Sequence, residues 1–112
     1  MDTITKYQEI VIEYLNSFLH RRPSNLPDID RYVLADKESN NFQLLDIGWQ
    51  GYQYVFTVVF HFRIKNGKVW LQRNITEHEI VDVLMEKGIP REDIVLGSVH
   101  PDMRPITGFA QA

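Results

Sequence analysis

The sequence of 112 residues contains no cysteine, which excludes a disulfide framework, a zinc–thiolate site and a cysteine nucleophile. It also has no long apolar run. No stretch approaches the ~20 apolar residues that a membrane span needs, and the opening MDTITKYQEI lacks the apolar core of a signal peptide. We therefore expect no membrane association and a cytoplasmic location.

Little in the sequence is typical of an enzyme. Gly48 and Gly51 stand alone near predicted strand ends, which indicates turns or bulges and not a phosphate-binding loop. The four histidines form no compact pattern such as H-E-x-x-H, and no serine has the setting of a nucleophile elbow. We expect no catalytic residue, metal or cofactor. A small enzyme is a third hypothesis, which requires a deep polar pocket.

An excess of basic residues is also missing. Twelve Lys and Arg face fifteen Asp and Glu, so the net charge is -3. Dedicated DNA binders carry a basic excess, because phosphate neutralisation supplies much of their affinity. The balance therefore argues against DNA binding, although it leaves room for a local basic patch.

The composition that is present, 44% hydrophobic and 24% charged, is that of a globular chain. We expect one domain over residues 1–112. Apolar residues at helical spacing predict a helix from residue 3 to about residue 20, with Asp2 or Thr3 as its cap and a stop at HRRPSN, where Pro23 blocks continuation. The apolar stripe consists of Ile4, Tyr7, Val11, Tyr14, Leu15 and Phe18.

From Asp28 onward the apolar period changes to two, which predicts strands. The segments DIDRYVLAD, FQLLDIGW and YVFTVVFHFRI alternate in this way. Asn66-Gly67 then predicts a tight hairpin, because a type I′ turn needs positive φ at both central residues. Four strands joined by short loops make an antiparallel meander.

The C-terminal part begins with a second predicted helix. Thr76 and Glu79 match a capping box at its start, and Gly88 fits the residue after its last turn. A short strand at residues 94–96 and an irregular tail follow, and the tail holds enough apolar residues (Met103, Ile106 and Phe109) to pack.

The predicted class is therefore α+β: an N-terminal helix, a four-stranded antiparallel meander, a second helix and a short C-terminal strand, with both helices packed on one face of the sheet. The helix-facing side would carry Phe60, Phe62, Ile64, Val69 and Leu71, and we expect Tyr52, Tyr54 and Phe56 on that same side. The other side would carry His61, Arg63, Lys65, Lys68, Trp70 and Gln72.

A tryptophan among cations is the unusual feature of that second side. The Asn-Gly turn pairs Lys65 with Lys68, Arg63 with Trp70, and His61 with Gln72. Arg63 would then lie over the Trp70 ring. Either Arg63 merely covers Trp70 on a solvated face, or the two anchor an interface, where Trp and Arg are enriched.

The tail offers a second region for contact. His100 and Arg104 stand beside the rigid Pro101 and Pro105. These polar groups either bond loop carbonyls of their own chain or form, with Phe109, a stiff arm that docks on another protein at low entropic cost. The candidate interface residues are therefore His61, Arg63, Trp70, His100, Arg104 and Phe109.

Four segments in this order and spacing give the chain a resemblance to a known family. They are LLDIGW, FHFRIKNGKVWLQRN followed by TE, KGIPREDIVLG, and the tail pattern HP--R--TGFA. Together they resemble the XisI family, the excision controlling factors of the fdxN element. The part from Gly67 to Gly97 is the most specific, whereas Val81 stands where the family pattern has a smaller residue.

The resemblance implies a role and not a reaction. XisI-like proteins are accessory factors for programmed excision of a DNA element in nitrogen-fixing bacteria, with a separate recombinase. XisH-like proteins, which resemble endonucleases, are the expected partners, and the family offers no catalytic residues to carry over. We expect a non-enzymatic regulator acting by protein contact. The alternative is a module that binds nucleic acid directly at the element ends, and a homo-oligomer through the open sheet face would compete for the same residues.

Overall fold

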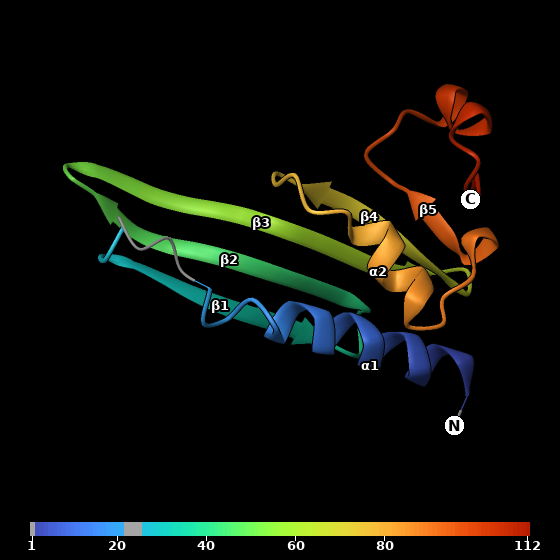
Figure 1. Cartoon of the computed structure of the whole chain (residues 1–112), viewed down its shortest axis with the longest axis horizontal. Helices are drawn as coiled ribbons and strands as arrows, with labels where there is room; N and C mark the ends of the chain where they lie inside the picture. Colours follow the sequence, from blue (N-terminus) through green and yellow to red (C-terminus); the bar gives the residue numbers. More distant parts are fainter. Residues whose placement is uncertain (1, 22–25) are drawn as a thin grey trace.

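The computed structural model describes residues 2–21 and 26–112 and confirms the α+β class (Figure 1). One five-stranded sheet has the order β1-β2-β3-β4-β5. The first four strands form the predicted antiparallel meander, and β5 runs parallel to β4. The elements are α1 (Thr3–Asn16), β1 (Ile29–Asp36), β2 (Asn41–Gln50), β3 (Gln53–Lys65), β4 (Lys68–Asn74), α2 (Ile80–Glu86), the 3-10 helix η1 (Arg91–Asp93), β5 (Ile94–Leu96) and the 3-10 helix η2 (Pro101–Thr107).

Helix α1 begins as predicted and ends early. Asp2 is its N-cap, because the Asp2 Oδ1 atom accepts a hydrogen bond of 2.7 Å from the Thr5 amide. The α-helix stops at Asn16, not near residue 20, since the Ser17 hydroxyl donates to the Tyr14 carbonyl and a turn follows. The predicted stop at Pro23 lies outside the described residues.

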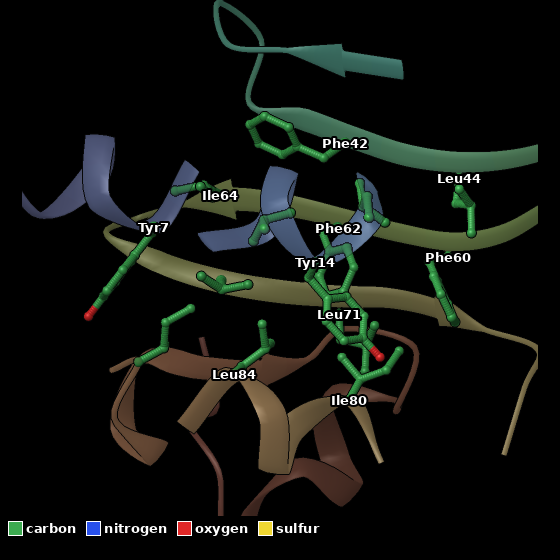
Figure 2. Packing of buried hydrophobic residues seen from close by; sticks show 14 of the residues in the cluster. Tyr7, Tyr14, Phe42, Leu44, Phe60, Phe62, Ile64, Leu71, Ile80 and Leu84 are labelled. Carbon is green, nitrogen blue, oxygen red and sulfur yellow. The ribbon is translucent and has the colours of Figure 1, made fainter. Parts of the chain in front are cut away.

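The core lies between the two α-helices and one side of the sheet. In Figure 1, α1 and α2 are both drawn on the near side of the strands. Figure 2 shows their side chains meeting those of β2, β3 and β4 in one apolar cluster. The five residues predicted for the helix-facing side are all buried, namely Phe60, Phe62, Ile64, Val69 and Leu71.

The second helix begins later than the sequence predicted. Thr76 does not cap it: the Thr76 hydroxyl donates to Asn74 Oδ1 and accepts from the His78 amide, which forms a local turn. Helix α2 therefore starts at Ile80, without a side-chain cap. Its end is as predicted, because Gly88 has a φ of 110° and closes a Schellman motif, in which the amides of Gly88 and Ile89 bond back into the last turn.

The β3–β4 hairpin confirms the Asn-Gly turn. Asn66 and Gly67 have φ values of 55° and 74°, as a type I′ turn requires. Arg63 lies opposite Trp70, and Lys65 lies opposite Lys68, as predicted. The predicted pairing of His61 with Gln72 is wrong, because a β-bulge between His61 and Phe62 places His61 opposite Arg73.

A second irregularity in β3 changes which side chains are buried. Leu44 pairs with Phe60 whereas Leu45 pairs with Val58, so Val59 is the extra residue of a bulge. The bulge reverses the sides of the residues before it. Tyr54 and Phe56 therefore point away from the helices, and the prediction that they share a side with Phe60 is wrong.

The C-terminal tail packs along the far edge of the sheet. Ala110 forms a β-bridge with Val95, and the Ala110 amide donates to the Ile94 carbonyl at 2.8 Å. The tail thus adds to the edge that β5 would otherwise expose. Its packing was predicted, but Met103 and Ile106 do not contribute to it, since 52% and 78% of their surface is exposed.

Candidate protein-interaction surfaces

Trp70 is buried, with only 7% of its surface exposed, which corrects the prediction that it stands on an open face. Its indole Nε1 donates to the Lys65 carbonyl at 3.0 Å. The cations over its ring are also not the predicted one. The Lys65 Nζ and the Arg104 Cζ each lie 5.1 Å from the ring centroid, so the turn and the tail cover Trp70.

Arg104 holds the tail in place. Its side chain donates to three backbone carbonyls, those of Val99 (3.0 Å), Gln111 (3.1 Å) and Gly97 (3.4 Å). These carbonyls lie before and after η2, so one planar guanidinium closes the tail into a loop over Trp70. Of the two interpretations of Arg104, bonding to its own chain is the one that the structure shows.

Phe109 and His100 also contact their own chain. Phe109 is half-buried against the core, with the Arg91 Cζ 4.8 Å from its ring centroid. His100 is exposed, and its Nδ1 accepts a hydrogen bond of 3.1 Å from the Asp102 amide, which caps η2. Phe109 is therefore an internal anchor, whereas the outer edge of the His100 ring is open to solvent.

His61 and Arg63 stay on the side of the sheet away from the helices, both half-buried. The His61 Nε2 is 3.1 Å from Asn41 Oδ1. Burial, helped by the positive charge of Arg63, lowers the pKa of His61 below its usual value, so the ring favours its neutral form. The structure therefore brings Arg63, Trp70 and Arg104 to one end of this face, with His61 next along the strand.

Two surfaces carry exposed apolar side chains, and the second of them was not predicted from the sequence. The first, the tail surface, consists of His100, Met103 and Ile106 on and beside η2. The hydrogen bonds of Arg104 tie the backbone on both sides of η2 together beneath this surface. The tail was predicted as a contact region through His100, Arg104 and Phe109, but Met103 and Ile106 were expected to pack, so the apolar part of this surface was missed.

The second surface, the distal face, lies on the side of β1, β2 and β3 away from the helices. The rings of Trp49 and Tyr54 meet there edge to face, with centroids 5.1 Å apart. The sequence did hold a signal for it: Leu44-Leu45 and Val58-Val59-Phe60 interrupt the alternation at the bulge. The face comprises Tyr32, Leu34, Ile47, Trp49, Tyr54 and Phe56.

A groove of about 370 Å³ separates α1 from the segment around α2. Its lining mixes apolar side chains such as Phe18 and Val83 with an ion pair, in which Lys87 Nζ lies 2.8 Å from Glu13 Oε1.

Within residues 2–21 and 26–112, no three His, Cys, Asp or Glu side chains are grouped to hold a metal ion. No helix of that part of the chain is long and apolar enough to cross a membrane.

Comparisons with known proteins place the chain in a family. The family model described as XisI protein matches residues 1–111. A XisI-like protein from Anabaena variabilis ATCC 29413, known from a crystal structure, shares 38% sequence identity with this chain. The two structures superpose with a TM-score of 0.91, and the match covers 97% of this chain and 99% of that one. The fdxN element excision controlling factor XisI from the same organism is 33% identical, with a TM-score of 0.85 and coverage of 99% and 100%. A comparison with curated proteins found no match. The chain belongs to the XisI family.

Proposed function

We propose that this protein is a non-catalytic accessory factor that controls excision of a DNA element by contacting a partner protein. The observation that carries the proposal is the full-length likeness to the fdxN element excision controlling factor XisI. The net charge of -3 supports protein contact over a dedicated DNA-binding role. The XisH-like, endonuclease-related protein that the family resemblance implies is the proposed partner.

The tail surface is the contact that we assign to this partner. Its apolar members, Met103 and Ile106, are exposed on a segment whose two ends the buried Arg104 joins by hydrogen bonds. A surface that is already ordered loses little conformational entropy on binding. Arg63 lies opposite Trp70, the residue that Arg104 of the tail covers, and is proposed as a charged contact beside the tail surface.

Co-expression with the XisH-like partner, followed by affinity purification, tests the proposal. The wild-type protein is expected to co-purify with the partner and to change its nuclease activity. Ile106→Asp is expected to weaken the complex roughly 30-fold, as the loss of an interface hot spot does. Tyr52→Asp is the matched control, because Tyr52 is fully exposed in the β2–β3 turn. Absence of both co-purification and an effect on activity would refute the proposal.

Direct contact with single-stranded nucleic acid is the second candidate function. The observation that favours it is the exposure of Trp49, Tyr54 and Phe56 on one sheet face, since bases stack on such rings. It predicts binding to a labelled single strand that weakens steeply with salt and with Arg63→Ala or Lys68→Ala. Fluorescence anisotropy measures this binding, and no binding at low salt would exclude the candidate.

A further inference from the structure

We propose that the distal face is the interface of a homodimer, in which two copies of the chain pack their sheets against each other. The proposal does not depend on the function proposed above, because the distal face and the tail surface are different parts of the molecule. It rests on the position of the face in the fold, its apolar area and the scarcity of charged side chains along its described strand segments.

The register of the sheet places the apolar side chains on one side. Tyr32 of β1 pairs with Leu45 of β2, which in turn pairs with Val58 of β3. Two more pairs, Ile47–Phe56 and Trp49–Tyr54, follow toward the β2–β3 turn. Antiparallel partners point to the same side of a sheet, so these residues form one continuous surface.

No described element of the chain covers this end of the sheet. In Figure 1 the β2–β3 hairpin projects well beyond α1 and α2, and η2 lies at the opposite end. The exposed fractions are 51% for Trp49, 55% for Tyr54 and 61% for Phe56, with 49% for Tyr32 and 53% for Leu34. The fold of one chain therefore leaves these large apolar side chains about half exposed to solvent.

The exposed area fits a dimer interface. An aromatic side chain presents roughly 150–250 Å² in full, so half-exposed side chains of this number leave on the order of 500 Å² of apolar surface. This is at the upper end of the largest apolar patch of a typical monomer. It also suffices for the apolar centre of a standard interface, which buries roughly 800 Å² of each partner.

A second copy fits the face better than a nucleic acid or a charged protein does. A two-fold axis sets the same patch of both copies together, so like charges within it would repel. Along the described strand segments 30–34, 45–49 and 54–58, the face carries one charged residue, Asp30 at the edge strand. On this face, those segments supply no cation for phosphate or for an acidic partner, and the nearby Arg73 of β4 donates to the Val58 carbonyl at 2.7 Å. Aromatic residues with few charges are typical of interface centres.

Sedimentation equilibrium of the purified chain tests the dimer. At concentrations on the order of 100 μM, well above a micromolar Kd, the mass is expected to be twice the chain mass of 13.2 kDa. Phe56→Glu is expected to weaken dimerisation by roughly 30-fold or more, because two like charges would be buried in the interface. Ile106→Glu, also at an exposed apolar residue, is the matched control and is expected to leave the dimer intact.

Tryptophan fluorescence provides a readout that needs no destabilising variant. Trp49 is half-exposed in one chain, whereas Trp70 is buried by the tail. Dilution of the wild-type protein is therefore expected to increase acrylamide quenching as Trp49 becomes accessible, with Trp70 as a constant background. Since the chain has no cysteine, a spin label on Tyr54→Cys is expected to show coupling between copies, and a label on Ile106→Cys serves for comparison.

Three results would overturn the proposal. The first is a monomeric wild-type mass at that concentration. The second is a dimer whose stability Phe56→Glu leaves unchanged while circular dichroism shows a folded chain. The third is a monomer in which a single-stranded oligonucleotide or the XisH-like partner protects Trp49 from quenching, since the distal face would then serve that ligand.

Discussion

The guanidinium carbon of Arg104 lies 5.1 Å from the centroid of the Trp70 ring, and both side chains are buried. The contact joins the C-terminal tail to the side of the sheet away from the helices. This contact explains why a tryptophan stands among cations in the sequence, because the C-terminal tail of the same chain packs on its ring. Arg63 stands opposite Trp70 in the ladder, but the residue that closes over the ring comes from a distant part of the sequence.

Trp70→Ala is expected to destabilise the fold, in contrast to what an exposed interface residue would do. Removing a buried Trp side chain costs about 3–5 kcal/mol, because a cavity remains. Urea unfolding measures the loss, and Trp70→Phe, which keeps an aromatic ring for Arg104, is expected to lose less. An unchanged unfolding midpoint for Trp70→Ala would show that the tail does not depend on this ring.

Tyr7→Phe is expected to remove the link between α1 and the segment before β5. The Tyr7 hydroxyl donates to Asp93 Oδ2, and burial, followed by that hydrogen bond and the nearby acids, raises the pKa of Tyr7 to about 12. The folded state favours the neutral phenol, so its contribution is complete below pH 10 and is lost as the pH rises toward 12. Loss of a hydrogen bond to a charged group costs about 1.5–3 kcal/mol.

Ultraviolet difference titration at alkaline pH checks the Tyr7 prediction. Subtracting the titration of Tyr7→Phe from that of the wild type isolates one tyrosine, which is expected to ionise near pH 12. The exposed Tyr52→Phe gives the control difference. A Tyr7 difference curve centred near the ordinary value of about 10 would contradict the hydrogen bond to Asp93.

Local signals in the sequence predicted much of this fold. Asn66, Gly67 and Gly88 adopt positive φ readily, so they indicate their turns independently of the rest of the sequence. Asp2 caps α1 for an equally local reason. The early start predicted for α2 failed because Thr76 bonds two residues away, to Asn74 and His78, and sequence does not show which of two local bonds a threonine makes.

The candidate site was less predictable because its geometry depends on bulges and distant contacts. One extra residue, Val59, moves Tyr54 and Phe56 to the other side of the sheet, although strict alternation assigns them to the core. The cover of Trp70 depends on where the tail returns, and alternation along β4 carries no information about the tail. The hydrophobic pattern thus predicts that a sheet has two sides, but the bulges decide which residues each side shows.

His61 is expected to make the fold less stable in mild acid. Burial and the charge of Arg63 lower its pKa in the folded state below the usual value of about 6.5. As the pH falls through that value, the unfolded chain binds a proton that the folded chain does not, so the free energy of unfolding falls. His61→Asn is expected to make the free energy of unfolding depend less steeply on pH in this range. Equal slopes in the wild type and His61→Asn, measured by urea unfolding, would contradict the prediction.

Gly48→Ala is expected to lower the free energy of unfolding strongly for a substitution that adds a single methyl group. Gly48 has a φ of 152°, and a Cβ there would stand 2.0 Å from the Asp28 carbonyl oxygen, which also accepts from the Trp49 amide. Backbone strain costs about 1–3 kcal/mol and overpacking about 1–3 kcal/mol more. Because the obstacle is the backbone leading into β1, the clash would push β1 away from β2.

Gly51 provides the matched comparison for Gly48. Its φ of 63° is left-handed too, but a Cβ there would meet nothing within 4 Å. Gly51→Ala should therefore cost only the conformational penalty, roughly 1–2 kcal/mol, and Gly51→Asn less, since Asn adopts this conformation more readily. Urea unfolding of the three variants is expected to rank Gly48→Ala as the least stable. A Gly48→Ala midpoint at or above that of Gly51→Ala would show that β1 does not approach β2 at Asp28 as closely as the structure places it.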